Sequence, residues 1–173
     1  MSSLLQMTKV YLANDHAGFA LKSVLIERLR AFGYETEDLG SHSFEAGDDY
    51  PDFITPCAKK VAADGAKPGG AQSFGVIIGG SGQGEAMCAN RVPGARAALF
   101  YGPVRASYAL DINGAPSEDG YDIVRIARRH NDANVLSLAS RFVKEEEAEE
   151  AVRVFLETPF SGDPRHVRRI GKF

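Results

Sequence analysis

Residues 74–91, FGVIIGGSGQGEAMCANR, organise the rest of the chain. The first part, residues 74–78, is apolar and strand-like, and glycines follow it. Residues 79–84 form a glycine-rich loop, and from Glu85 onward the sequence is compatible with a helix. Glycines leave main-chain N–H groups uncovered, and the start of a helix attracts negative charge. This stretch therefore predicts a strand, a loop and a helix start that together hold an anion or an oxyanion.

Two nucleotide-binding motifs come close to this pattern without matching it. A P-loop beginning at Gly79 would need Lys and then Ser or Thr where Glu85 and Ala86 stand. A dinucleotide fingerprint beginning at Gly80 would need a small residue in place of Glu85. The Glu85 carboxylate would repel a phosphate, but it is well placed to accept a proton from carbon beside an oxygen that the loop holds. The alternative is that Glu85 is only a favourable first-turn acid and Ser81 a loop former.

The composition is that of one globular domain covering residues 1–173. With 173 residues and 44% hydrophobic content, the chain can bury a full core. A net charge of −3 and a pI near 5.8 predict no nucleic-acid or anionic-membrane partner. No apolar run approaches the roughly 20 residues of a membrane span, and no signal-peptide pattern is present, so we expect a cytoplasmic protein. The two cysteines and four histidines lack metal-ligand spacing, which predicts no metal and no disulfide.

The spacing of apolar residues predicts strands that alternate with helices. Strands are expected at residues 9–13, 34–38, 74–78, 95–100 and 134–138. Helices are expected at residues 21–32, 50–63, 85–92, 104–112, 121–129 and 143–157, and a basic tail covers about 159–173. Such alternation predicts a five-stranded parallel sheet with helices on both faces, which is a three-layer α/β/α doubly wound, Rossmann-like fold.

Ligands of doubly wound folds bind beyond the carboxyl ends of the strands. Asp15 and His16 follow the first predicted strand, the glycine loop follows the third, and Arg141 follows the last. We expect these three clusters to meet in one crevice, with His130 entering from just before a strand. Taken singly, His130 is more often a surface or core histidine, and a basic end such as 165–169 is usually only solvated.

Several motifs of this chain occur, in this order, in a known family. They are NDHAGF at 14–19, DYP at 49–51, GGSGQGE at 79–85, ANRVPGAR at 89–96, HNDAN at 130–134, Arg141, and Arg165-His166 with Arg169. On these residues the chain resembles ribose-5-phosphate isomerase B and the related galactose-6-phosphate isomerase subunits. The resemblance implies interconversion of an aldose phosphate and a ketose phosphate, typically ribose 5-phosphate and ribulose 5-phosphate. Ring opening and a C1/C2 proton shift through an enediolate accomplish it, without metal or cofactor.

The resemblance also implies roles for individual residues. In one branch of the family a cysteine just before the glycine loop is the base; Gly79 stands there, so this chain resembles the branch whose base is the loop glutamate. The implied catalytic residues are Glu85 as proton shuttle, Ser81 for the enediolate oxygen, and His130 for ring opening with Asp15 nearby. The implied substrate-binding residues are His16, Tyr50, Gly80, Gly82, Gln83, Gly84, Asn90, Asn131, Arg141, Arg165 and Arg169. The arginines and His16 would grip the phosphate, whereas Tyr50 and Asn90 have the alternative of anchoring a loop or capping a helix.

The family forms homodimers whose site is shared between subunits, so the basic tail would serve the neighbour's crevice; a tetramer stays open. One difficulty is that a helix N-terminus lowers the pKa of a first-turn carboxyl such as Glu85, and we expect burial on substrate binding to offset this. One departure is a polar Gly/Pro loop at 111–121, an insertion that would cover the crevice or extend a subunit contact. It leaves open other substrates, namely galactose 6-phosphate, allose 6-phosphate or a tetrose phosphate, and also a non-catalytic sugar-phosphate-binding protein.

Overall fold

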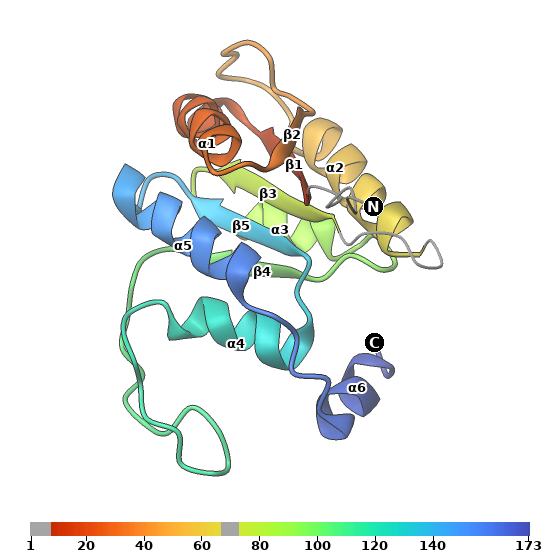
Figure 1. Ribbon diagram of the computed structural model, residues 1–173. Coiled ribbons are helices and arrows are strands. Elements are labelled where there is room, and N and C mark those ends of the chain that lie inside the picture. The colour runs from red at the N-terminus through yellow and green to blue at the C-terminus, as the bar shows by residue number, and fades with distance from the viewer. Residues whose placement is uncertain (1–7, 67–72) are drawn as a thin grey trace, which may run out of the picture.

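The apolar segments form a parallel five-stranded sheet in the computed structural model, which describes residues 8–66 and 73–173. The strand order is β2-β1-β3-β5-β4 (Figure 1). The strands are β1 Lys9–Asn14, β2 Glu35–Asp38, β3 Phe74–Gly79, β4 Ala97–Phe100 and β5 Val135–Ala139. All neighbours pair in parallel, as the alternation of strands and helices predicted. The predicted fold class is confirmed.

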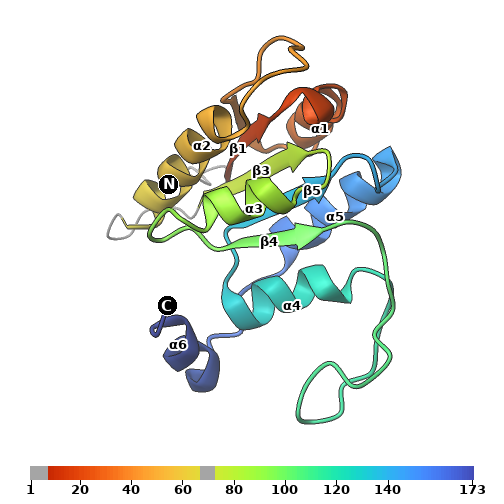
Figure 2. The same ribbon diagram turned by 180° about the vertical axis from the view of Figure 1, so that it is seen from behind.

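Helices cover both faces of this sheet (Figures 1 and 2). The helices are η1 His16–Gly18, α1 Phe19–Ala31, α2 Pro51–Gly65, α3 Gln83–Ala89, α4 Asp122–Asn131, α5 Glu145–Glu157 and α6 Pro164–Ile170. Apolar residues of α1, α4 and α5 share one buried cluster with the sheet, and those of α2 and α3 share the other. None of the helices in the described ranges is long and apolar enough to cross a membrane.

The chain changes direction across the sheet between β1 and β3. From β1 it passes to β2 at one edge, and then returns to β3 on the other side of β1. Strands β1 and β3 end at the pair Asn14 and Ile78, and strands β3 and β5 end at the pair Gly79 and Ala139. The carboxyl ends of β1, β3 and β5 are therefore level with one another, which is where doubly wound folds bind ligands.

The helix predicted at residues 104–112 is wrong. This segment consists of irregular backbone and bends, and most of its large apolar side chains are exposed. Val104, Tyr108 and Ile112 are 63%, 87% and 82% exposed. Amphipathic spacing stabilises a helix only when its apolar face is buried, and nothing within residues 8–66 and 73–173 covers these side chains.

The basic tail, in contrast, contains a helix that the spacing did not predict. Asp163 precedes α6, its carboxylate accepts the main-chain N–H of Arg165 at 2.7 Å, and Pro164 occupies the first helical position. These start signals are in the sequence, but α6 is only 7 residues long and largely exposed, so apolar spacing could not reveal it.

Smaller corrections concern helix ends and faces. The helix after the glycine loop starts at Gln83 and ends at Ala89, so it ends before Pro93. The helix expected at residues 21–32 ends at Ala31, and Phe32, which follows α1, is 54% exposed. Lys22 is buried on that helix, because its ammonium group donates to Asp38 at 2.6 Å and to the Ser41 carbonyl at 2.7 Å. The Gly/Pro-rich segment 64–73, between a predicted helix and a predicted strand, lies partly outside the described residues.

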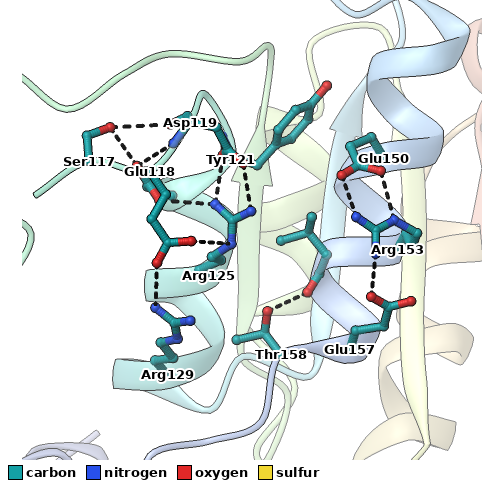
Figure 3. A network of polar contacts seen from close by, with 12 residues as sticks. Ser117, Glu118, Asp119, Tyr121, Arg125, Arg129, Glu150, Arg153, Glu157 and Thr158 are labelled. Carbon is teal, nitrogen blue, oxygen red and sulfur yellow. Dashed lines mark hydrogen bonds and ion pairs between the residues drawn. The ribbon is translucent and has the colours of Figure 1, made fainter.

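The segment predicted to be an insertion, residues 111–121, is anchored at the start of α4 by charged side chains (Figure 3). The Arg125 guanidinium donates to both carboxylate oxygens of Asp119, at 2.7 and 2.8 Å, and to Asp122 at 3.0 Å. The second oxygen of Asp122 accepts from the Ser117 hydroxyl at 2.6 Å and from the Glu118 N–H at 2.9 Å. Pairing with Arg125 lowers the pKa of Asp119 to about 2. The end of the insertion is thus a fixed part of the fold.

Candidate active site

The three polar clusters expected at the carboxyl edge of the sheet lie together. The Ser140 hydroxyl, just after β5, donates to the carbonyl of Ala17 at 2.9 Å and to that of Gly79 at 3.0 Å. The Arg141 N–H donates to the Gly80 carbonyl at 3.1 Å. These bonds join the ends of β1, β3 and β5 and hold the glycine loop between its two neighbours.

The glycine loop turns into α3 at Gly82, whose φ of 69° is left-handed and therefore suits glycine. The Gly82 carbonyl accepts from the Ser137 hydroxyl at 2.6 Å, so β5 supports the loop from below. We did not predict Ser137; the available signal was a single polar residue inside the apolar strand VLSLA. At the loop's tip Ser81 is exposed, and its hydroxyl accepts the Gln83 N–H at 3.3 Å.

The Glu85 side chain folds back over Gly79. A methyl group built on Gly79 would lie 1.9 Å from Oε1 of Glu85 and 2.0 Å from its Cδ. Glu85 is only 4% exposed, and its carboxyl group occupies the space that any side chain at position 79 would need. A cysteine base at position 79 and a glutamate base at position 85 would therefore compete for one place.

Burial sets the protonation behaviour of Glu85. Burial raises the pKa of the Glu85 carboxyl above its ordinary value of 4.5, and the nearby Asp15 charge acts in the same direction. The main-chain N–H of Glu85, which has the second-largest effect, and the His16 side chain lower this pKa, but burial outweighs them. The concern that a helix start would leave Glu85 a weak base is thus resolved by burial, before any ligand binds. A raised pKa makes a carboxylate a better proton acceptor.

Two further predicted residues border this loop. Gly84 faces Tyr50, because a methyl group on Gly84 would lie 2.8 Å from the Tyr50 hydroxyl oxygen. Gly80 faces Arg141, because a methyl group there would lie 3.2 Å from the guanidinium carbon. Asp15 is buried, and its Oδ1 accepts the N–H groups of Ala17 and Gly18 at 2.9 and 3.2 Å. The predicted residues at this edge are Asp15, His16, Tyr50, Gly80, Ser81, Gly82, Gln83, Gly84, Glu85 and Arg141.

The other predicted residues lie at the opposite, amino edge of the sheet. His130 and Asn131 end α4, which precedes β5, and Arg165 and Arg169 belong to α6. In Figures 1 and 2, α6 lies beyond the tails of the strand arrows. β5 has 5 residues, which puts about 16 Å between the two edges at roughly 3.3 Å per residue. One chain therefore does not bring His130 to Glu85.

At the amino edge the basic side chains pack against one another. The rings of His130 and His166 stack with centroids 4.3 Å apart, and Nη2 of Arg165 lies 3.4 Å from Nε2 of His166. Burial lowers the pKa of His130, and the charges of His166 and Arg165 lower it further. Nε of Arg165 is buried and has no hydrogen-bond partner among the described residues. This cluster has unused donors that suit an anionic ligand.

Asn90 has a structural explanation at this edge. Its side-chain carbonyl accepts the Ala97 N–H at 2.7 Å, and its amide donates to the Ala97 carbonyl at 3.0 Å. Both bonds join the end of α3 to the start of β4. Asn90 therefore anchors the connection between these elements, which was the structural alternative to a role in substrate binding. Within residues 8–66 and 73–173, no group of three His, Cys, Asp or Glu side chains is placed to hold a metal ion.

The fold and the carboxyl-edge site define a doubly wound α/β protein with a buried carboxylate over a glycine loop at the topological switch point. The family model described as Ribose/Galactose Isomerase matches residues 10–116 and 119–173. The chain belongs to this family.

Curated relatives agree over nearly the whole chain. Ribose-5-phosphate isomerase B of Mycolicibacterium paratuberculosis is 38% identical over 162 residues, which cover 94% of this chain and 87% of the relative. The probable ribose-5-phosphate isomerase B of Mycoplasma genitalium is 37% identical over 163 residues, covering 94% of this chain and 91% of the relative.

Solved structures show the same fold. The crystal structure of Mycoplasma genitalium ribose-5-phosphate isomerase B with bound ribulose-5-phosphate matches with a TM-score of 0.80 and 36% identity, covering 96% of this chain and 95% of that one. A ribose 5-phosphate isomerase from Thermotoga maritima matches with a TM-score of 0.76 and 37% identity, covering 95% of this chain and 96% of that one.

Proposed function

We propose that this chain is an aldose-ketose isomerase that interconverts ribose 5-phosphate and ribulose 5-phosphate. The observation that carries the proposal is the buried Glu85 carboxyl group, which lies over Gly79 beside a loop of glycine N–H groups. A C1/C2 proton shift needs one base that reaches both carbons and donors already oriented toward the developing oxyanion. Relatives at 37–38% identity carry the name ribose-5-phosphate isomerase B, and one solved relative holds ribulose-5-phosphate.

In this proposal Glu85 removes the proton from C2 of the open-chain aldose, and the electron pair moves to form an enediolate. The loop N–H groups and the Ser81 hydroxyl stabilise the negative oxygen. Glu85 then returns the proton to C1, while the hydroxyl proton of O2 passes to O1 and C2 becomes the ketone carbonyl, so that no external acid or base is consumed. Its raised pKa favours the first step, and no metal or cofactor takes part.

We further propose that the functional unit is a homodimer in which each site combines the carboxyl edge of one subunit with the amino edge of its partner. His130 would open the sugar ring, and Asn131 would contact the sugar. Arg165 and Arg169 would hold the phosphate together with His16 and Arg141. The support is that the two edges of one chain are about 16 Å apart, while each edge carries half of the expected site. The predicted cytoplasmic location and the possible tetramer stay predictions.

Mixing two inactive variants tests both proposals at once. Glu85→Gln and His130→Ala should each abolish isomerisation of ribose 5-phosphate. When the two are unfolded and refolded together, sites shared across a twofold interface should recover about a quarter of the unaltered activity, because half of the dimers are mixed and each carries one intact site. Glu85→Gln mixed with Glu85→Ala is the matched control and should recover nothing. No recovery in the first mixture would refute the shared site.

One observation favours a different substrate. Asp111, Ala115 and Pro116 of the segment predicted to be an insertion line a cavity of about 180 Å³ together with Arg129 and His130. If His130 opens the ring, the insertion stands beside the sugar and can select its length. Turnover should be measured on four-, five- and six-carbon sugar phosphates. Fast turnover of another sugar phosphate and none of ribose 5-phosphate would indicate that the insertion determines substrate specificity. No turnover of any of these sugar phosphates would favour a non-catalytic sugar-phosphate-binding protein.

A further inference from the structure

His16 has a partner that comes from a distant part of the sequence. Asp48 lies in the loop between β2 and α2, 32 residues after His16. Its Oδ1 is 2.8 Å from the ring Nδ1 of His16 and accepts the main-chain N–H of His16 at 3.2 Å. The Asp48 side chain is only 6% exposed. A carboxylate is costly to bury unless it is paired, so this contact decides where the loop can sit.

The contact also selects one form of the imidazole ring. A carboxylate only accepts hydrogen bonds, so Nδ1 of His16 must carry the proton. Nε2 has no hydrogen-bond partner among the described residues. The edge of the His16 ring also packs against Phe44 with centroids 6.1 Å apart, which limits rotation. The ring is thus held at one nitrogen and open at the other, as histidines oriented by a carboxylate are in functional sites.

The position of this pair connects it with the site. His16 directly follows Asp15 at the carboxyl end of β1, and its side chain is near enough to Glu85 to affect that carboxyl group electrostatically. Oδ2 of Asp48 is buried and has no hydrogen-bond partner in the described ranges. If the pair served only to anchor the loop, the main-chain N–H of His16 would suffice and the ring would not need to be oriented.

We propose that Asp48 is a positioning residue that holds Nδ1–H of the His16 ring so that Nε2 faces the phosphate group of the substrate and, protonated as well in that complex, donates to a phosphate oxygen. This inference rests on the proposed function, in which His16 helps to hold the phosphate. Asp48 itself does not touch the substrate. It acts by holding Nδ1 and by keeping the ring from turning away.

Inorganic phosphate is the probe, and its dissociation constant is measured by calorimetry on the full chain. Asp48→Ala and His16→Ala should each weaken phosphate binding about tenfold, the usual effect of losing one hydrogen bond to a charged group. In the His16→Ala background, Asp48→Ala should add less than about a twofold loss. Asp48→Asn keeps an acceptor oxygen and should fall between the unaltered chain and Asp48→Ala. Glu45→Gln, an exposed carboxylate in the same loop, is the control and should change nothing.

A second readout separates positioning from simple anchoring. Nitrogen NMR of the His16 ring should show a proton on Nδ1 in the unaltered chain, and protons on both ring nitrogens once phosphate is bound; in Asp48→Ala the Nδ1 proton should no longer be fixed. A role in loop anchoring alone would lower the melting temperature of Asp48→Ala and leave its phosphate affinity unchanged. That pattern would overturn the proposal, and so would the absence of phosphate binding by the unaltered chain. Phosphate binding that depends jointly on His16 and Asp48, without turnover of ribose 5-phosphate, would refute the proposed function and support this inference.

Discussion

Replacing Gly79 with alanine should inactivate the proposed isomerase although Glu85 itself is unchanged. The added methyl carbon would lie 1.9 Å from Oε1 of Glu85, whereas ordinary contact begins near 3.4 Å. The carboxyl group must therefore move by about 1.5 Å, and a displacement of about 1 Å can cost roughly 100-fold in rate. The backbone tolerates the change, because Gly79 is not among the positive-φ glycines.

The assay is kcat and KM for ribose 5-phosphate. We expect kcat to fall about 100-fold, close to the effect of removing a general base, and KM to change little because the phosphate is held elsewhere. Gly75→Ala is the matched control: it lies on the same strand and face, and its methyl group would meet Val61 and Val135 at 3.2 Å without approaching Glu85. It should lower stability slightly and preserve kcat. A Gly79→Ala enzyme with kcat within about twofold of the unaltered value would refute the assigned position of the base.

The same geometry predicts how the base can be exchanged. In Gly79→Cys combined with Glu85→Ala, a thiol would occupy the place that the carboxyl group leaves. This double variant should be at least about tenfold more active than Glu85→Ala alone, since general bases contribute about 100-fold or more. Gly79→Cys alone should be impaired, because the thiol and the carboxyl group then compete for one space.

Two further predictions concern stability. The pKa of Glu85 is raised in the folded chain, so folding favours the neutral carboxyl and the chain loses stability as pH rises from the ordinary value of 4.5 through the raised value. Glu85→Gln should therefore have the higher melting temperature at pH 7, and the difference should vanish below pH 4.5; equal melting temperatures at both pH values would contradict the assigned burial effect. Arg128 is 3% exposed, donates to the Thr158 and Ala133 carbonyls, and packs over Phe74 with its guanidinium 4.8 Å from the ring. Arg128→Met should lower the free energy of unfolding by about 3 kcal/mol in urea titrations, because buried partners lose their donor. Arg129→Met, its exposed neighbour, should cost about 0.5 kcal/mol or less, and equal losses would argue against the buried role.

Local patterns predicted most of the architecture. The strand segments of the parallel sheet are short apolar runs between glycines and polar turns, and such runs need only neighbouring residues to be recognised. The glycine loop was predicted for the same reason, since its glycines and Glu85, three residues after Gly82, are near neighbours in the sequence. The helix predicted at residues 104–112 was wrong, because the apolar spacing was favourable but these apolar side chains are not buried in the fold.

The site was predictable in its residue types and in part of its assembly. The motifs NDHAGF, GGSGQGE and HNDAN indicated which residues to examine. The first two were expected to meet at the carboxyl edge, and they do. HNDAN was expected to enter the same crevice, but His130 ends α4 at the other edge, because its place depends on the direction of α4 relative to β5. Asp48 and Ser137 were not predicted, because the role of each depends on a contact with a residue far away in the sequence.

What the sequence by itself determined, then, is the alternation of strands and helices, the glycine loop with its following carboxylate, and the family to which the chain belongs. Local propensity and residue spacing carry this information, because they act between neighbours along the chain. Only the tertiary structure decided that Glu85 is buried over Gly79 with a raised pKa, that Asp48 orients His16, and that the basic cluster is separated from the base by the sheet. Burial, desolvation and paired charges depend on which distant elements pack together, and that is settled by the fold as a whole.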